Sequence, residues 1–248
     1  MLERLLRAFG RDAGSQSAVN PLREFANSPR CVRLMNKWDH YFDVYHRHLQ
    51  RFRGKAITMI EIGVFNGGSL HMWRDYLGPK ARIVGVDINP GCVAFAEPGT
   101  EIIIGDQTDR DFLRKLGEHL EGAEVLLDDG GHTMTQQIAT FEEMYPHLHP
   151  EGVYICEDLH TSYLAEFGGG YGKAGTYLEF AKTLVDRLNA AHNNGAGPPP
   201  DDFTIGTDSL HFYDSMLVIE RHARSAPESK VYGSKAEFRY IAPSVSGA

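Results

Sequence analysis

The sequence lacks a long apolar run and an excess of positive charge, and it contains few cysteines. No stretch approaches the roughly 18 apolar residues of a membrane span, so we expect no membrane segment. Its 25 Lys and Arg residues are outnumbered by 33 Asp and Glu, and this acidic balance argues against a nucleic-acid partner, which requires a basic face. The three cysteines, Cys31, Cys92 and Cys156, are widely spaced and odd in number. They predict no disulfide framework and a reducing, cytoplasmic setting.

Internal repeats and low-complexity tracts are also absent from the sequence. A length of 248 residues suits one α/β domain better than two. The start, MLERLLRAFG, is amphipathic and no cleavage pattern follows it, so we expect a short helix rather than a signal peptide. Residues 10–30 are rich in Gly, Ser, Asn and Pro. We therefore predict an N-terminal helix and flexible segment over residues 1–30 and a single domain over residues 31–248.

Five short apolar runs, each closed by a glycine or an acid, alternate with stretches of helical periodicity. The runs are ITMIEIG, RIVGVD, EIIIGD, EVLLDD and GVYICED. This alternation predicts an α/β fold with a mostly parallel sheet and helices on both faces. The later stretch DSLHFYDSMLVIERH predicts an antiparallel hairpin around Asp214 and Ser215. In such a sheet, ligands bind outside the carboxyl ends of the strands.

Three further segments give weaker signals. Residues 32–50 place Leu34, Trp38, Tyr41 and Tyr45 at helical spacing, which predicts a helix whose aromatic side chains pack in the core or, alternatively, wall a ligand pocket. The glycine-rich stretch within residues 166–175 predicts either a mobile lid or a plain surface loop. The stretch EFRYIAP near the end is a possible edge strand.

A glycine-rich turn, EIGVFNGGS, follows the first apolar run. Phe65 stands where a dinucleotide fingerprint needs its second glycine, which disfavours a nicotinamide cofactor. The acid-x-Gly pattern instead resembles the first motif of class I S-adenosylmethionine-dependent methyltransferases. Asp87 is expected to accept ribose hydroxyls, and Asp106 lies where that fold contacts adenine. The predicted residues for S-adenosylmethionine are Glu61, Gly63, Asn66, Gly67, Ser69, Asp87, Asp106, Gln107 and Asp128.

Two acidic pairs end the fourth and fifth runs, Asp128-Asp129 and Glu157-Asp158. Neighbouring parallel strands lie about 4.8 Å apart, so these tips can converge on one ion. Crowded carboxylates need a cation or protonation to offset their repulsion, and hard oxygen ligands favour Mg²⁺, with Mn²⁺ also suitable. Capping of the next helix by Asp128 or Asp129 is the alternative, but it does not account for four acids.

His132 follows Asp129 by three residues, past two glycines, and is expected to lie over the same site. A histidine titrates near neutral pH and can remove a proton from a hydroxyl. We therefore predict His132 as the general base, with a surface position or metal ligation as alternatives. His160 is the second candidate base, or a group that orients a ligand. The candidates for contacts with the acceptor are His160, Tyr163, Tyr171 and Tyr177.

Together, the stretches KWDHY, MIEIGVFNGGSLHMWRDYLG, IVGVDINP, GDQTD, LLDDGGH and VYICEDLHTSY resemble the metal-dependent macrolide sugar O-methyltransferases of the mycinamicin 2''-O-methyltransferase type. The cephalosporin hydroxylase family shares part of this pattern. The resemblance covers residues 35–220 and implies a Rossmann-like class I methyltransferase fold. It also implies Mg²⁺ on Asp129, Glu157 and Asp158, with His132 as the base. The macrolide enzymes carry an additional N-terminal domain, which is not expected within these residues.

The resemblance implies an S-adenosylmethionine- and Mg²⁺-dependent O-methyltransferase. Its expected substrate is a small-molecule glycoside or polyketide, methylated on a sugar hydroxyl whose oxygen is bound to the metal, and a homo-oligomer is expected. The alternatives are a phenolic, catechol-type O-methyltransferase, a protein of the cephalosporin hydroxylase kind that acts with a partner, and a binding module that retains the fold. The intact acids and histidine favour an enzyme, because a binding module has no need of a base.

Overall fold

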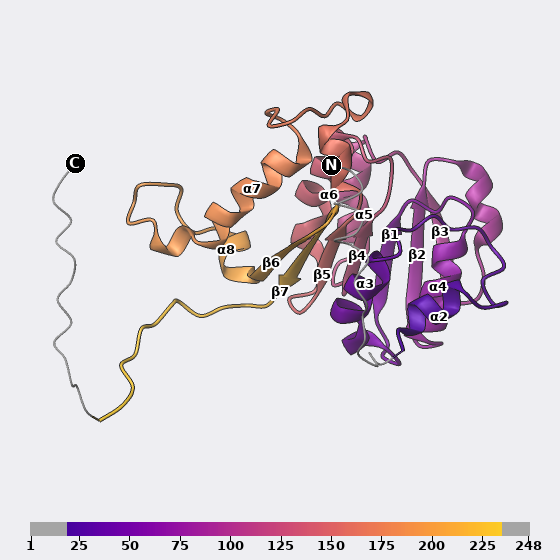
Figure 1. The fold of residues 1–248 in the computed structure, drawn as a ribbon, viewed down its shortest axis with the longest axis horizontal. Helices are drawn as coiled ribbons and strands as arrows, with labels where there is room; N and C mark the ends of the chain where they lie inside the picture. Colours follow the sequence, from indigo (N-terminus) through magenta and orange to yellow (C-terminus); the bar gives the residue numbers. More distant parts are fainter. Residues whose placement is uncertain (1–18, 235–248) are drawn as a thin grey trace, which may run out of the picture.

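A seven-stranded sheet forms the centre of the molecule, in a computed structural model that describes residues 19–234 (Figure 1). The strand order is β3-β2-β1-β4-β5-β7-β6. The strands are β1 Thr58–Ile62, β2 Arg82–Asp87, β3 Thr100–Ile104, β4 Val125–Asp128, β5 Val153–Cys156, β6 Thr207–Tyr213 and β7 Met216–Arg221. The first five pair in parallel, while β7 pairs antiparallel with β5 and β6. The predicted runs and the C-terminal hairpin are confirmed.

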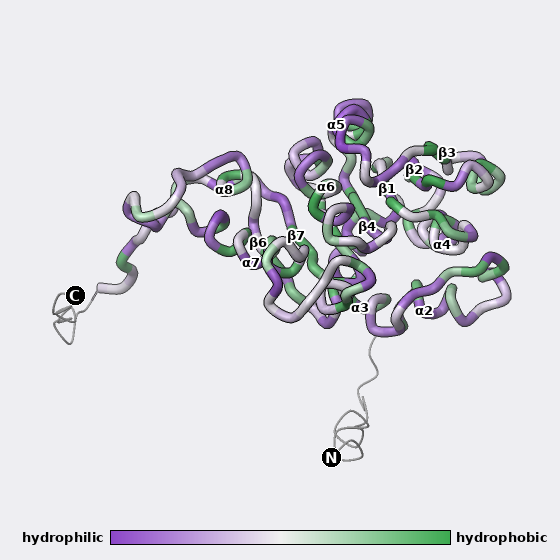
Figure 2. The backbone as a smooth tube through the Cα atoms, turned by 90° about the horizontal axis from the view of Figure 1, so that it is seen from above, coloured by the Kyte–Doolittle hydropathy of each residue, from purple (hydrophilic) through white to green (hydrophobic). Residues whose placement is uncertain are grey.

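Helices cover both faces of the sheet (Figure 2). They are α2 Pro21–Ala26, α3 Tyr41–Leu49, α4 Gly68–Leu77, α5 Arg110–His119, α6 Met134–Met144, α7 Tyr177–Leu188 and α8 Asp202–Gly206. One apolar cluster joins the sheet to α2, α3 and α4, and a second joins it to α5, α6 and α7. Alternation along β1 sends Met59 to the first cluster and Ile60 to the second.

The helix predicted over residues 32–50 is wrong in its first half, since α3 begins only at Tyr41. Tyr41 and Tyr45 are fully buried in the core, but Leu34 is 70% and Trp38 50% exposed. Residues 31–40 lack helix because their backbone packs against the start of α4. A Cβ added at Gly68 would collide with the carbonyl groups of this segment, so the close approach depends on that glycine. Tertiary packing here overrides helical periodicity.

The expected flexible segment over residues 1–30 contains a helix, α2, in its described part. Asn20 caps it by accepting a hydrogen bond from the backbone N–H of Leu22, and Pro21 occupies the first helical position. Leu22 and Phe25 are buried against the core, so this segment is attached more firmly than its composition predicts. The predicted helix over MLERLLRAFG and the stretch EFRYIAP lie outside the described residues. Among the helices that the structure describes, none has the length and hydrophobicity needed to cross a membrane.

The strand order reverses between β1 and β4. These two strands are parallel, so their carboxyl ends lie at the same edge of the sheet. From β1 the chain proceeds outward through β2 and β3, and then returns to β4 and β5 on the other side. In open α/β sheets a crevice forms at such a switch point, beyond the carboxyl ends of the strands. The glycine turn follows β1 and the two acidic pairs follow β4 and β5, so the fold places all of them at this edge.

Candidate active site

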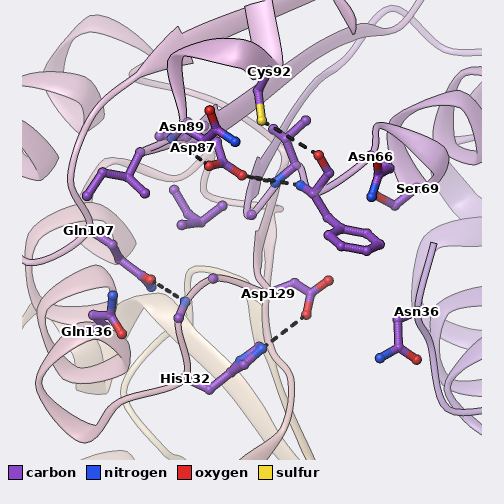
Figure 3. A pocket seen from close by; sticks show the side chains of 18 of the residues that line it. Asn36, Asn66, Ser69, Asp87, Asn89, Cys92, Gln107, Asp129, His132 and Gln136 are labelled. Atoms are coloured by element: carbon purple, nitrogen blue, oxygen red, sulfur yellow. Dashed lines mark hydrogen bonds and ion pairs between the residues drawn. The ribbon is translucent and has the colours of Figure 1, made fainter. Parts of the chain in front are cut away.

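A cavity of about 620 Å³ opens at the carboxyl edge of the sheet (Figure 3). Its walls come from the segments that follow β1, β2, β3, β4 and β5, together with the segment before α3. Six predicted methyl-donor residues line it, namely Gly63, Asn66, Ser69, Asp87, Asp106 and Gln107. Asp129, His132 and Asp158 line the same cavity. The structure therefore brings the two predicted halves of the site into one space.

The glycine turn after β1 depends on its first glycine. Gly63 has φ of 96°, and a Cβ at this position would fall on the carbonyl oxygen of Asp129. Asp87, at the end of β2, is fixed by backbone N–H donors: its Oδ2 accepts from Val64 at 2.8 Å and Phe65 at 3.2 Å, and its Oδ1 accepts from Asn89 at 2.8 Å. This half of the site is held in place by hydrogen bonds to the backbone.

Three residues that line the cavity adopt the left-handed conformation without being glycine. Phe65 has φ of 51°, His132 of 57° and Asp158 of 56°. Side chains with a Cβ rarely adopt this conformation, and such strain gathers at functional sites, where it costs on the order of 1–3 kcal/mol. Two of these residues, His132 and Asp158, belong to the predicted cation half, and their side chains lie 3.5 Å apart.

Three predicted methyl-donor residues do not line the cavity: Glu61, Gly67 and Asp128. Asp128 is fully buried, its Oδ1 accepts from Gln107 Nε2 at 2.7 Å, and burial raises its pKa to about 7. Glu61 is also fully buried and accepts a hydrogen bond from Ser69 Oγ at 2.9 Å. Burial raises the pKa of Glu61 to about 7. Both carboxyls thus lie behind side chains that reach the cavity, Gln107 and Ser69. Their direct contact with S-adenosylmethionine stays a prediction.

An acid–histidine group forms at the tips of β4 and β5. His132 Nε2 lies 3.8 Å from Asp129 Oδ1 and 3.5 Å from Asp158 Oδ2. One ligand atom from each of these three residues lies within 4.8 Å of the others. Each side chain is about one-fifth exposed, so the group is open to the cavity. The structure thus brings the predicted base beside two of the predicted ligands.

Glu157 is the third predicted ligand, and its carboxyl points to a different set of partners. It is almost fully buried, and its Oε1 accepts hydrogen bonds from Lys37 Nζ at 2.8 Å and from the Tyr45 hydroxyl. Lys37 Nζ also lies 2.5 Å from Asp129 Oδ2 and 3.6 Å from Glu61 Oε1. Ligation by Glu157 stays a prediction, whereas its contact with Lys37 is a feature that the sequence did not reveal.

Negative charge exceeds positive charge around this lysine. Burial lowers the pKa of Lys37, but the carboxylates of Asp129, Glu157 and Glu61 outweigh that effect, so the pKa of Lys37 lies well above its ordinary value. Burial, with Asp129 nearby, raises the pKa of Glu157. One ammonium therefore faces three carboxyls, with Asp158 beyond them. A bound divalent cation would balance this excess.

The candidate acceptor residues do not line the cavity, and Tyr177 is fully buried in the second apolar cluster. His160 Nδ1 is 2.7 Å from Ser215 Oγ and 3.9 Å from Asp158 Oδ1, a position that suits an orienting role. Tyr163 and Tyr171 stack on each other with ring centroids 6.1 Å apart, and Tyr171 is 94% exposed. No residue of the loop 166–175 lines the cavity. A lid role for that loop stays a prediction.

Comparisons with known proteins agree with this geometry. A family described as a methyltransferase domain matches residues 60–159, which run from β1 through the second acidic pair. The MycE methyltransferase of the mycinamycin biosynthetic pathway, solved in complex with Mg and SAH, superposes with a TM-score of 0.72. That match has 27% sequence identity and covers 84% of this chain and 55% of the other. Residues 60–159 thus match a methyltransferase domain, and the sheet has the fold of the class I methyltransferases.

Curated proteins similar to this chain are named O-methyltransferases. The 8-demethyl-8-alpha-L-rhamnosyl tetracenomycin-C 2'-O-methyltransferase of Streptomyces olivaceus is 36% identical over 196 residues, which are 75% of this chain and 51% of the relative. The mycinamicin VI 2''-O-methyltransferase of Micromonospora griseorubida is 30% identical over 190 residues, 71% of this chain and 47% of the relative. The chain thus spans about half the length of these relatives.

The sequence analysis missed the residues that the methyltransferase domain receives from outside its matched region. Lys37 enters the prediction only as part of the stretch KWDHY, and Tyr41 and Tyr45 are predicted to pack in the core or to wall a ligand pocket. All three contact acids at the tips of β4 and β5. A lysine four residues before the first of two tyrosines, themselves four apart, is the only signal for them, and it does not indicate the partners.

Proposed function

We propose that the protein is an S-adenosylmethionine-dependent O-methyltransferase that uses Mg²⁺ or Mn²⁺ and methylates a sugar hydroxyl of a natural product, such as a polyketide glycoside. One observation carries the proposal: the glycine turn with Asp87 and the acid–histidine group of Asp129, His132 and Asp158 line the same cavity. A bound methyl donor and a base that acts beside a cation would therefore lie next to each other in this cavity. The relatives are named for O-methylation of a rhamnosyl tetracenomycin-C and of mycinamicin VI, and these names support this substrate class.

The donor half has the features that S-adenosylmethionine requires. Gly63 lets the turn after β1 pack directly against the backbone of Asp129, which joins the donor half to the acid–histidine group. Asp87 lines the cavity with carboxylate lone pairs left for ligand hydroxyls. Asp106 and Gln107, which follow β3, line the same cavity and would give further polar contacts to the donor. These residues would hold the nucleoside of the donor with its methyl group directed toward His132.

The cation half fits a hard divalent ion. Asp129 Oδ1 and Asp158 Oδ2 both face His132, and oxygen donors of this kind are the preferred ligands of Mg²⁺. The Nδ1 atom of His132 is buried and forms no hydrogen bond with the described residues, so this imidazole has a polar atom left for a bound group. Asp129 and Asp158 would hold the ion, with Glu157 as the predicted third acid. When bound, Mg²⁺ makes a neighbouring hydroxyl more acidic and stabilises developing negative charge.

His132 then acts as the general base. Its Nε2 takes the proton of the acceptor hydroxyl, the oxygen attacks the methyl carbon, and the carbon–sulfur bond breaks with its electron pair remaining on sulfur. The products are a methyl ether and S-adenosylhomocysteine, and the proton remains on the imidazole until solvent removes it. Asp129 and Asp158 lie within 4 Å of Nε2 and stabilise the imidazolium that forms. Holding both reactants in one cavity supplies several kcal/mol in favourable cases.

The test is methyl transfer from labelled S-adenosylmethionine by the purified full chain, with Mg²⁺, to three acceptor sets. These are polyketide glycosides that carry deoxyhexoses, the corresponding aglycones, and catechols. We expect label only in the glycosides, and loss of transfer when a chelator is added. Label in catechols alone would replace the proposal by the phenolic alternative. Full activity in the presence of the chelator would show that the reaction needs no divalent cation.

We also propose that the chain acts in the cytoplasm on small molecules and that it assembles as a homo-oligomer. The names of related enzymes, which act on tetracenomycin-C and demethylmacrocin compounds, support small-molecule substrates. Light scattering on the purified chain tests the second, because a monomer mass at micromolar concentration would contradict it.

A further inference from the structure

The segment from Lys37 to Tyr45 lies outside the matched region, residues 60–159, yet it supplies three polar groups to the acids of the site. Lys37, Tyr41 and Tyr45 are spaced four residues apart. The two tyrosines lie one turn apart in α3, so their side chains leave the same side of the helix. Lys37 lies in the chain just before α3 and reaches the same acids.

Two acids of the site each have one oxygen held by this segment and one oxygen turned toward His132. Asp129 Oδ2 accepts from Lys37 Nζ at 2.5 Å, while its Oδ1 faces His132 at 3.8 Å. Asp158 Oδ1 accepts from the Tyr41 hydroxyl at 2.8 Å, while its Oδ2 faces His132 at 3.5 Å. The held oxygens form the back of the site and the other two face the cavity.

Glu157 is also held through one oxygen, although it does not line the cavity. Lys37 and Tyr45 both donate to its Oε1, which leaves Oε2 as the oxygen that neither group holds. Its backbone carbonyl accepts from Gln137 Nε2 at 2.8 Å, so the residue is fixed at both ends. Three acids from two strand tips are therefore oriented by donors from one segment.

Lys37 also joins the two halves of the site. Its side chain is 2% exposed, and its ammonium lies 3.6 Å from Glu61 Oε1, behind the donor half, as well as against Asp129 and Glu157. Clustered carboxylates at this depth repel one another strongly unless a positive charge compensates them. The ammonium is a positive charge that belongs to the chain and is present whether or not a metal is bound.

We propose that Lys37, Tyr41 and Tyr45 are positioning residues, which hold one oxygen of each of Asp129, Glu157 and Asp158 so that the other oxygen is available to a divalent cation. Lys37 additionally keeps these acids together before the cation binds. This inference rests on the proposed function for its cation, but its tests measure stability and metal binding and need no methyl transfer. A glycoside that is not methylated would refute the proposed function and leave these measurements to decide the inference.

The charge role of Lys37 is tested by thermal unfolding in the presence of a chelator. Lys37→Met should lower the melting temperature by about 10 °C, since three acids lose their compensating charge. Adding Glu157→Gln to Lys37→Met should restore at least half of this loss, because one of the three negative charges is removed. Lys55→Met, which changes an exposed lysine, is the control and should leave the melting temperature unchanged.

Equal losses in the single and double variants would show that Lys37 only packs, and would overturn its charge role. An unchanged melting temperature in Lys37→Met would do the same. If Lys37→Met does not accumulate as folded protein, the tyrosine variants decide the inference.

The orienting role is tested by Mn²⁺ binding, measured by electron paramagnetic resonance. Tyr41→Phe and Tyr45→Phe should each weaken Mn²⁺ binding about tenfold, because removal of such outer contacts typically costs 10- to 100-fold in metal affinity. Binding of S-adenosylhomocysteine, measured by calorimetry, should stay within about twofold, since neither tyrosine lines the donor half.

Tyr145→Phe is the matched control for these variants. It also removes a buried tyrosine hydroxyl, which is bonded to Thr207 at 2.7 Å, away from the acids of the site. Its affinity for Mn²⁺ should equal that of the unaltered chain. If Tyr41→Phe and Tyr45→Phe bind Mn²⁺ as tightly as Tyr145→Phe, or if the unaltered chain binds no Mn²⁺, the inference fails.

Discussion

The two halves of the cavity are built in different ways. In the donor half, Asp87 accepts three backbone hydrogen bonds and Gly63 brings two chain segments together, so local structure fixes the groups. In the cation half, Asp129 and Asp158 are oriented by side chains from a distant segment, and one lysine faces several acids. In the donor half, backbone N–H groups satisfy the carboxylate of Asp87, whereas the acids of the cation half outnumber the one ammonium beside them. From this difference we expect that only the second half needs a bound ion to balance its charge.

Asp129→Asn should break the cation half and leave the donor half intact. Loss of one ligand and of its negative charge should lower the rate of methyl transfer at least about 10³-fold. Mn²⁺ binding should weaken by more than tenfold, while S-adenosylhomocysteine binds as before. Rates with a labelled donor, together with the two binding measurements, check this. A parallel loss of donor binding would show that the halves are not separable.

His132→Ala should affect the chemical step alone. Removal of a general base costs about 10²- to 10⁴-fold in rate, so kcat should fall within that range. Donor binding and Mn²⁺ binding should change less than about threefold, since His132 is assigned as base rather than as ligand. Loss of Mn²⁺ binding in this variant would assign His132 to the metal instead.

Glu61 lies where the two halves meet, and it gives the site a pH-dependent stability. Its pKa is raised to about 7 by burial, so the folded chain binds a proton that the unfolded chain releases. The stability should therefore fall as pH rises from about 4.5 to about 7, by up to about 3 kcal/mol in the absence of divalent ions. In Glu61→Gln this fall should be smaller. Denaturant unfolding at several pH values in a chelator measures it, and identical profiles for both proteins would contradict the assignment.

Asp87→Asn should give the smallest effect, confined to the donor half. The amide keeps its acceptor oxygen but loses the charge-assisted bonds to ribose hydroxyls, which should weaken S-adenosylhomocysteine binding about tenfold. Mn²⁺ affinity should be unchanged. Calorimetry with both ligands checks this, and Asp208→Asn, at an exposed position of β6, is the control. Equal donor affinity in the two variants would remove Asp87 from the donor site.

Much of the fold could be predicted because its signals are local. The five parallel strands, the hairpin around Asp214 and Ser215, and the helices α4 to α7 all follow from periodicity within short windows. The helix predicted over residues 32–50 failed in its first half because Leu34 and Trp38 match the period without being buried. Periodicity reports a repeat of apolar residues, but it does not report whether another element covers them.

The candidate site was predicted in outline for the same reason. Strand ends share one edge of a parallel sheet, so the acids after β4 and β5 and the glycine turn after β1 had to meet. Which oxygen of each acid faces the cavity could not be predicted. Nor could the burial of Asp128 behind Gln107. These details depend on side-chain packing between elements that are far apart in the chain.

The sequence by itself determined the succession of strands and helices along the chain and the polar residues at their ends. Each of these depends on neighbours within a few positions. Only the tertiary structure decided that Lys37 lies among the acids. Its hydrogen bonds to Asp129 and Glu157 join residues 92 and 120 positions apart. No local pattern specifies such a pair, because the energy that places a buried ammonium among carboxylates exists only once the surrounding core has excluded water.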